Sequence, residues 1–162
     1  MRRLRRALLW LPLLALAACG SDEPPPPPPP PPAPTVVSLT LKASPGVNPD
    51  AQGQAKPLHV RILKLASGVD FVAADFFALD QGLDKELGSD LKGSADFVLA
   101  PGATEVWQAK LDDDTRVIGV MAAYQAIDTA QWRAWKEIPR NATTLLTAEF
   151  GPKGVELREA AP

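Results

Sequence analysis

The sequence is poor in the side chains that most active sites and metal centres need. Its 162 residues include one cysteine and one histidine, which excludes an internal disulfide framework and a zinc site built from several cysteines. The histidine, His59, has no nucleophile or carboxylate marked as its partner, which argues against a serine or cysteine hydrolase. We therefore expect a protein that is not an enzyme and uses no cofactor, metal or small-molecule substrate.

Basic residues are also scarce once the first six positions are set aside. Four of the 17 lysines and arginines are Arg2, Arg3, Arg5 and Arg6, so 13 basic residues remain against 19 acidic ones. Nucleic-acid-binding domains carry clustered basic residues on one face. The mildly acidic balance of the remaining chain predicts no nucleic-acid partner.

The first 18 residues have the layout of a secretory signal peptide. The arginines precede an apolar stretch over residues 7–18 that only Pro12 interrupts, and small residues precede Cys19. Twelve apolar residues are too few to span a bilayer, which takes about 20. We predict a signal peptide over residues 1–18.

The residues Leu16-Ala17-Ala18-Cys19 resemble the bacterial lipobox, in which the cysteine thiol receives a diacylglyceryl group and the peptide is cut before it. Lipidation of Cys19 would account for an otherwise unpaired thiol in a secreted chain, and several acyl chains hold a protein stably on a membrane. An ordinary signal peptide that contains a cysteine is the alternative. Gly20 stands where similar lipoproteins of the inner membrane have Asp, which points to the inner leaflet of the outer membrane.

Half of the 18 prolines form an unbroken run at positions 24–32. Such a run adopts the extended polyproline helix and would reach roughly 28 Å, at about 3.1 Å per residue. We interpret residues 19–34 as the lipidated cysteine and a semi-rigid stalk, followed by one domain over residues 35–162. A low-complexity tail without a role is the alternative.

That domain is predicted to be mostly β, with a short helical insertion. Apolar alternation or a continuous apolar run predicts strands at residues 36–43, 58–66, 95–99, 105–111, 116–124, 143–150 and 154–158. Within residues 70–91 the apolar side chains recur every three or four positions, which is typical of a helix, and Gly82 and Gly88 should break it into short helices. Residues 130–137 are predicted to be a short helix or irregular. Seven or so short strands favour a β-sandwich.

Two groups of carboxylates are candidates for a metal or catalytic site. The run Asp112-Asp113-Asp114 lacks the spacing of a calcium loop, and three adjacent carboxylates cannot all reach one ion, so a solvated turn is expected. Carboxylates on the polar side of the helical stretch, such as Asp75 and Asp84, would need a substrate cleft that the sequence does not indicate.

The connection between the first two predicted strands, residues 44–57, is unusually long. It has 14 residues and is rich in proline, glycine and polar side chains, whereas hairpin loops usually have two to five residues. Loops of this length either serve a function or pack against their own domain. The residues alone leave a protein-docking loop and a self-packed connection equally open.

Several segments, in this order, resemble the TssJ family of type VI secretion lipoproteins. They are residues 47–50, Gly53 and residues 57–65, then 75–79, 101–102, 118–124 and 132–133. The resemblance covers nearly all of the chain after the stalk, and the lipobox agrees with it.

The resemblance implies a transthyretin-like β-sandwich with a helical addition, attached to the outer membrane by its lipid. It also implies a partner, the periplasmic C-terminal region of TssM, an inner-membrane protein that forms a trans-envelope complex with TssL. The contact with TssM is expected at the loop between the first two strands. The residues expected to bind TssM are Val47, Asn48, Pro49, Asp50, Ala51, Gln52, Gly53 and Gln54.

Within this loop, Pro49 would fix a backbone angle, while the side chains of Asn48 and Asp50 would bond to nearby backbone amides. Val47 would offer a small apolar contact. The alternative function is a general envelope-assembly or carbohydrate-binding module, which coplanar exposed rings among Trp107, Trp132 and Trp135 would favour. A lipid-anchored hydrolase is the third possibility, against which the lack of nucleophile–base pairs argues.

Overall fold

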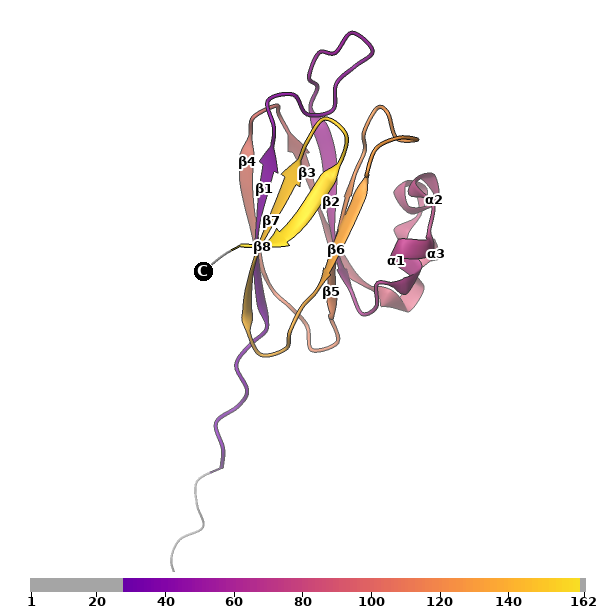
Figure 1. Ribbon diagram of the computed structural model, residues 1–162. Coiled ribbons are helices and arrows are strands. Elements are labelled where there is room, and N and C mark those ends of the chain that lie inside the picture. The colour runs from indigo at the N-terminus through magenta and orange to yellow at the C-terminus, as the bar shows by residue number, and fades with distance from the viewer. Residues whose placement is uncertain (1–27, 161–162) are drawn as a thin grey trace, which may run out of the picture. The chain divides into compact units, whose positions relative to one another are not determined.

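Eight strands form two four-stranded sheets in the computed structural model, which describes residues 28–160 (Figure 1). The predicted signal peptide, Cys19 and the first prolines of the stalk lie outside the described residues. No helix within residues 28–160 is long and apolar enough to cross a membrane. The strands are β1 (Val36–Ala43), β2 (Leu58–Leu65), β3 (Leu91–Leu99), β4 (Thr104–Lys110), β5 (Val117–Ala122), β6 (Arg133–Glu137), β7 (Thr143–Phe150) and β8 (Val155–Glu159).

The two sheets face each other as a sandwich, which confirms the predicted fold class. The first sheet has the strand order β4-β1-β7-β8, with β1 parallel to β7 and antiparallel to β4. The second has the order β3-β2-β5-β6, and all its pairings are antiparallel. Because β1 and β2 belong to different sheets, residues 44–57 carry the chain from one sheet to the other.

The main core lies between the sheets and is built from the inward faces of alternating strands. In β1 the inward residues are Val37, Leu39 and Leu41, and in β2 they include Val60 and Ile62, all without exposed surface. These are the faces that the alternation predicts. Full burial of one such side chain stabilises the fold by about 1.5–3 kcal/mol, so this face of each strand sets the register.

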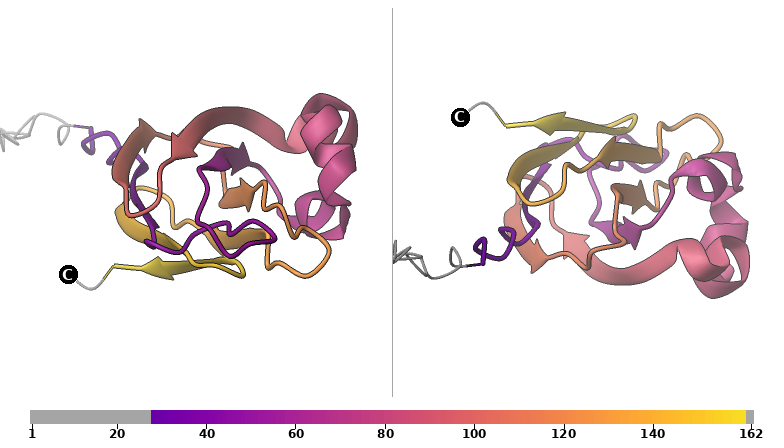
Figure 2. Two further views of the ribbon diagram at one scale, coloured as in Figure 1. Left: turned by 90° about the horizontal axis from the view of Figure 1, so that it is seen from above. Right: turned by 90° about the horizontal axis from the view of Figure 1, so that it is seen from below.

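Three short helices cover the outer face of the second sheet (Figures 1 and 2). They are α1 (Val69–Ala73), α2 (Phe76–Gln81) and α3 (Leu83–Leu87), followed by a 3₁₀ turn at Gly88–Asp90. Phe71 is fully buried against the sheet, where a Cβ on Gly119 of β5 would lie only 3.0 Å from its ring. Gly82 and Gly88 stand at the helix ends, as predicted, and Gly88 has a positive φ of 49° that an L side chain rarely adopts.

Polar contacts cap α2 and attach the end of α1 to the sheet. The Asp75 carboxylate accepts hydrogen bonds from the amides of Phe77 and Ala78 at 2.9 and 3.4 Å, which caps α2. The Arg133 guanidinium donates to the carbonyls of Phe71 and Ala74 at 3.0 and 2.6 Å. Arg133 therefore ties the end of α1 to β6, and Asp75 has a structural role.

The prediction for residues 130–137 is wrong, because Arg133–Glu137 is strand β6. It pairs antiparallel with β5, with Gly119 opposite Trp135. The strand lies at the sheet edge, so its alternation is weak, and the three-residue spacing of Trp132 and Trp135 resembles a helical period. Strand β3 also begins at Leu91, four residues earlier than predicted.

Candidate functional site

The connection 44–57 projects from one end of the sandwich and has a defined conformation (top of Figure 1). At its tip the Asp50 amide donates to the Gln54 carbonyl at 2.9 Å, and the Gly53 amide donates to the Asp50 carbonyl at 2.9 Å. Gly53 has φ +76°, a conformation that favours glycine. The tip is therefore a tight, internally bonded turn.

Asp50 organises this turn with its side chain. One carboxylate oxygen accepts from the amides of Gln52 and Gln54 at 3.0 and 2.8 Å, and the other lies 2.9 Å from the Lys56 ammonium. The hydrogen bond from Lys56 and the backbone amides hold the pKa of Asp50 below its usual range. Asp50 bonds to nearby amides as the sequence predicts.

Asn48 holds the base of the loop. Its side chain is buried, with 4% exposure, and its backbone is left-handed, with φ 48°. The amide nitrogen donates to the Pro57 carbonyl at 2.9 Å, and the amide oxygen accepts from the Gln125 backbone amide at 2.8 Å. Asn48 holds the loop shape as expected, but the prediction that it does so through nearby backbone amides is wrong. Its partners are the Pro57 carbonyl, nine positions away, and the amide of Gln125, 77 positions away, which had no sequence signal.

The expectation that Val47 offers an apolar contact to a partner is wrong for this structure. Val47 has no exposed surface and belongs to the main core. An apolar side chain at the loop base gains more from burial than from exposure, so Val47 fixes the loop from beneath. The predicted contact residues that are exposed are Ala51, Gln52, Gly53 and Gln54, while Pro49 and Asp50 are half-buried.

Other connections meet the loop at the same end of the sandwich, as the view from above in Figure 2 shows. The Ser44 amide donates to the Phe150 carbonyl at 2.9 Å, and the Gly102 amide donates to the Ser44 carbonyl at 3.2 Å. The Asn48–Gln125 bond adds the connection between β5 and β6. The loop is thus supported by three neighbouring segments.

Asp112 and Asp114 make surface ion pairs with lysines, and His59 lies beside the Asp96 carboxylate at the surface. His59 Nε2 and Arg61 Nε lie 3.1 and 2.7 Å from one Asp96 oxygen. Asp112 lies 3.7 Å from Lys64, and Asp114 makes an ion pair with a neighbouring lysine. Within residues 28–160, no three histidine, cysteine or carboxylate side chains gather as metal ligands would.

The sequence over residues 35–153 matches the profile of a family described as type VI secretion lipoproteins, under the names VasD, EvfM and TssJ. The chain belongs to the TssJ family. The match covers nearly all of the sandwich, so the assignment rests on the folded domain. No curated protein matches the chain significantly.

Solved structures agree with this family. The T6SS lipoprotein TssJ1 from Pseudomonas aeruginosa is 36% identical, with a TM-score of 0.77 over 80% of this chain and 98% of that one. Lip from Serratia marcescens, a membrane-bound component of the type VI secretion system, is 30% identical, with a TM-score of 0.69 over 78% and 98%. A chain of a type VI membrane complex is 25% identical, with a TM-score of 0.66 over 76% and 98%.

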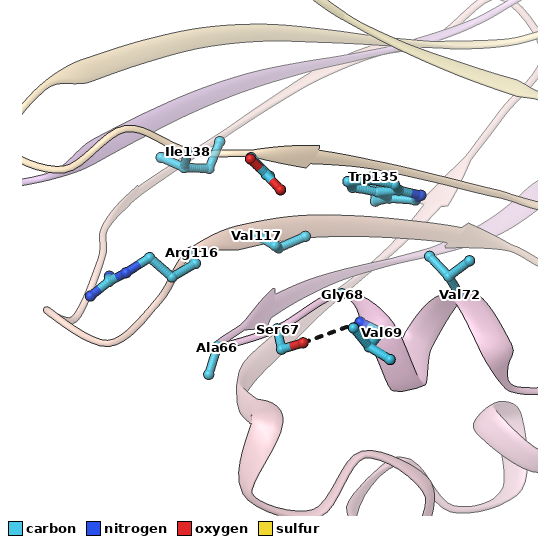
Figure 3. Close-up of a pocket in the computed structure, with 10 residues that line it drawn as sticks. Ala66, Ser67, Gly68, Val69, Val72, Arg116, Val117, Trp135 and Ile138 are labelled. Carbon is cyan, nitrogen blue, oxygen red and sulfur yellow. Dashed lines mark hydrogen bonds between the residues drawn. The ribbon is translucent and has the colours of Figure 1, made fainter.

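The TssJ-family domain also has an apolar groove of about 660 Å³ beside α1 (Figure 3). Val69 and Val72 of α1 line one side, and Val117, Trp135 and Ile138 line the other. Of the three tryptophans considered for a carbohydrate platform, only Trp135 lines this groove, with 46% of its surface exposed. None of the predicted contact residues lies in the groove.

Among the same three tryptophans, Trp107 and Trp132 pack against the core clusters. The TssJ-family domain therefore does not bring these three rings together as one exposed face. The alternative of a carbohydrate module gains no support from their positions.

Proposed function

We propose that this TssJ-family lipoprotein tethers the periplasmic C-terminal region of TssM to the outer membrane through loop 44–57. The observation that carries the proposal is the loop's preformed shape: Asp50 and Asn48 bond its backbone, Val47 is buried beneath it, and its tip is exposed. A preordered loop loses little conformational entropy on binding. A relative in a type VI membrane complex supports a role in assembly.

The membrane end of the tether is the N-terminal segment. We infer that Cys19 carries the lipid in the inner leaflet of the outer membrane and that residues 19–34 act as a spacer. TssL would be reached only indirectly, through TssM. This function needs no bond-making step by the domain itself.

Exposed side chains of the loop tip provide the direct test. Replacing both glutamines, Gln52→Ala with Gln54→Ala, should weaken binding of the purified TssM periplasmic region at least tenfold, an effect typical of interface hot spots. The full-length chain in detergent should be used. The matched control, Gln81→Ala with Gln108→Ala, changes two other exposed glutamines and should bind normally. Equal affinity of the two double variants would defeat the docking role.

A wider deletion of residues 48–54 should abolish binding, but the structure changes what it tests. Asn48 bonds to two other segments, so its removal also alters the loop base. The deletion variant is therefore informative only if thermal unfolding shows that the sandwich remains folded.

The lipid anchor has its own test. Cys19→Ser removes the thiol that the lipid would modify and should move the protein from the membrane fraction to the periplasmic fraction. Normal membrane retention of Cys19→Ser would show that another segment holds the protein on the membrane.

A further inference from the structure

We propose that the partner-binding surface extends from the loop tip onto the connection between β5 and β6, and that Asn48 is the positioning residue that joins the two. This inference rests on the proposed function and specifies its site. We call the exposed residues within 51–54 and 125–129 the composite surface. It consists of Ala51, Gln52, Gly53, Gln54, Gln125, Ala126, Asp128 and Thr129.

Asn48 links the loop to the β5–β6 connection through two hydrogen bonds of its side chain. The nitrogen of its side-chain amide donates a hydrogen bond to the Pro57 carbonyl at 2.9 Å, and the oxygen accepts one from the Gln125 backbone amide at 2.8 Å. The amide is buried, so loss of either bond would leave an unpaired polar group away from water. Asn48 therefore sets the position of the β5–β6 connection relative to the loop.

The β5–β6 connection has a defined shape of its own. The amides of Thr129 and Ala130 both donate to the Ala126 carbonyl, at 3.1 and 3.0 Å. Tyr124 is buried beneath the segment, and Ile127 packs against the cluster under the helices. As in the loop, buried side chains hold the base and leave short polar side chains exposed, so both halves are preordered for binding.

The exposed chemistry of the composite surface indicates the kind of partner. Three of its side chains are neutral amides, Gln52, Gln54 and Gln125, and Asp128 is its only charged residue. The charge of neighbouring Asp50 is balanced by Lys56 at 2.9 Å. The surface therefore fits a protein face that offers hydrogen-bonding groups and little net charge, and binding should depend only weakly on salt.

The test measures binding of the purified TssM periplasmic region to full-length protein in detergent. Gln125→Ala with Asp128→Ala should raise the Kd about tenfold, because both side chains are exposed contacts. The matched control is Gln81→Ala with Asp84→Ala, which makes the same two changes on exposed residues of α2 and α3. This control should bind like the parent protein.

Asn48→Gly tests the positioning role, because glycine accepts the left-handed backbone but removes both side-chain bonds. It should weaken binding, and its effect should be less than additive with the Gln125/Asp128 changes, as expected for coupled residues. With the Gln81/Asp84 changes it should be additive. Additivity in both combinations would overturn the positioning role. If Asn48→Gly does not fold, the Gln125/Asp128 variant still decides the extent of the surface.

The two levels of the proposal fail in different ways. Loss of binding in the Gln52/Gln54 variant, together with normal binding in the Gln125/Asp128 variant, would overturn the composite surface and leave the docking loop in place. Normal binding in both would overturn the proposed function as well. A Kd that rises more than about tenfold between low and high salt would contradict the neutral partner face.

Discussion

Two connections in this domain reach a defined shape by opposite means. Residues 44–57 form no helix or strand and are held by side-chain bonds of Asp50 and Asn48 to backbone groups. Residues 66–90 form three short helices that bury Phe71, Phe76, Leu79 and Leu87 on the second sheet. One connection is ordered mainly by hydrogen bonds and the other mainly by burial.

The difference determines what each connection can do. Hydrogen bonds among groups at the base of the loop leave the side chains at its tip exposed, so they can contact a partner. Burial of part of the apolar surface of the helices makes the insertion contribute to stability, while Val69 and Val72 of α1 stay exposed along the groove at its margin. We therefore expect substitutions in the insertion to change unfolding, and those in the loop to change binding.

The largest expected effect is on stability, from Phe71→Ala. Phe71 is fully buried in the cluster under the helices, and removal of a buried phenylalanine ring costs about 3–5 kcal/mol. Denaturant unfolding should show this loss, while TssM binding at a temperature where the variant is folded should be unchanged. Phe77→Ala, at an exposed position of α2, is the control. Loss of binding by the folded Phe71→Ala variant would show that the two connections are coupled.

A smaller loss is expected from Arg133→Ala. Its guanidinium donates to two carbonyls at the end of α1 and lies 4.5 Å from the Trp132 ring. Hydrogen bonds from a charged group contribute about 1.5–3 kcal/mol. Hydrogen exchange should become faster in α1 and stay unchanged in loop 44–57. Arg133→Lys should give an intermediate effect, and faster exchange in the loop would contradict the separation of the two regions.

Within the loop, Gly53→Ala should cost about 1 kcal/mol, because Gly53 has φ +76°. No atom lies within 4 Å of the added Cβ, so the cost comes from backbone strain alone. Gly46→Ala is the matched control, since its Cβ would meet only an ordinary contact at 3.8 Å. Unfolding midpoints of the two variants give the comparison. Equal midpoints would argue against the bonded turn.

The smallest effect concerns pH. The pKa of Asp50 is lowered, first by the hydrogen bond from Lys56, so its ionised form supports the loop at neutral pH. This support is lost as the pH falls below about 4 and through the folded-state pKa. The amide resonances of Gln52 and Gln54 should shift in that range while the sandwich stays folded. Asp50→Asn should abolish the shift, and its persistence would assign the titration to another group.

The local sequence pattern was sufficient to predict elements that have short-range contacts or one fully buried face. Strands β1 and β7 match their predicted bounds because each alternates apolar and polar residues over eight positions. The helical insertion was predicted from its three-to-four-residue period and its glycines. The shape-holding role of Asp50 was also predictable, because its partners lie within six residues.

Local pattern did not predict the features that depend on a sheet edge or on contacts between distant segments. Strand β6 has one partner strand and a weakly alternating pattern, so the spacing of Trp135 in the strand and Trp132 just before it suggested a helix. Val47 could be recognised as apolar, but its burial depends on residues from both sheets. The functions of Asn48 and Arg133 depend on partners 77 and about 60 positions away.

The order of residues along the chain by itself determined the β-rich class, the helical insertion and the position of a long loop, because periodicity and turn chemistry act between near neighbours. The family was indicated by the resemblance of several ordered segments to known members. Only the tertiary structure decided that the loop crosses between two sheets, that Val47 lies beneath it and that Asn48 joins it to Gln125. These features arise from packing between distant segments. The stabilisation they give is gained only when the two sheets pack together, so a local sequence pattern cannot predict them.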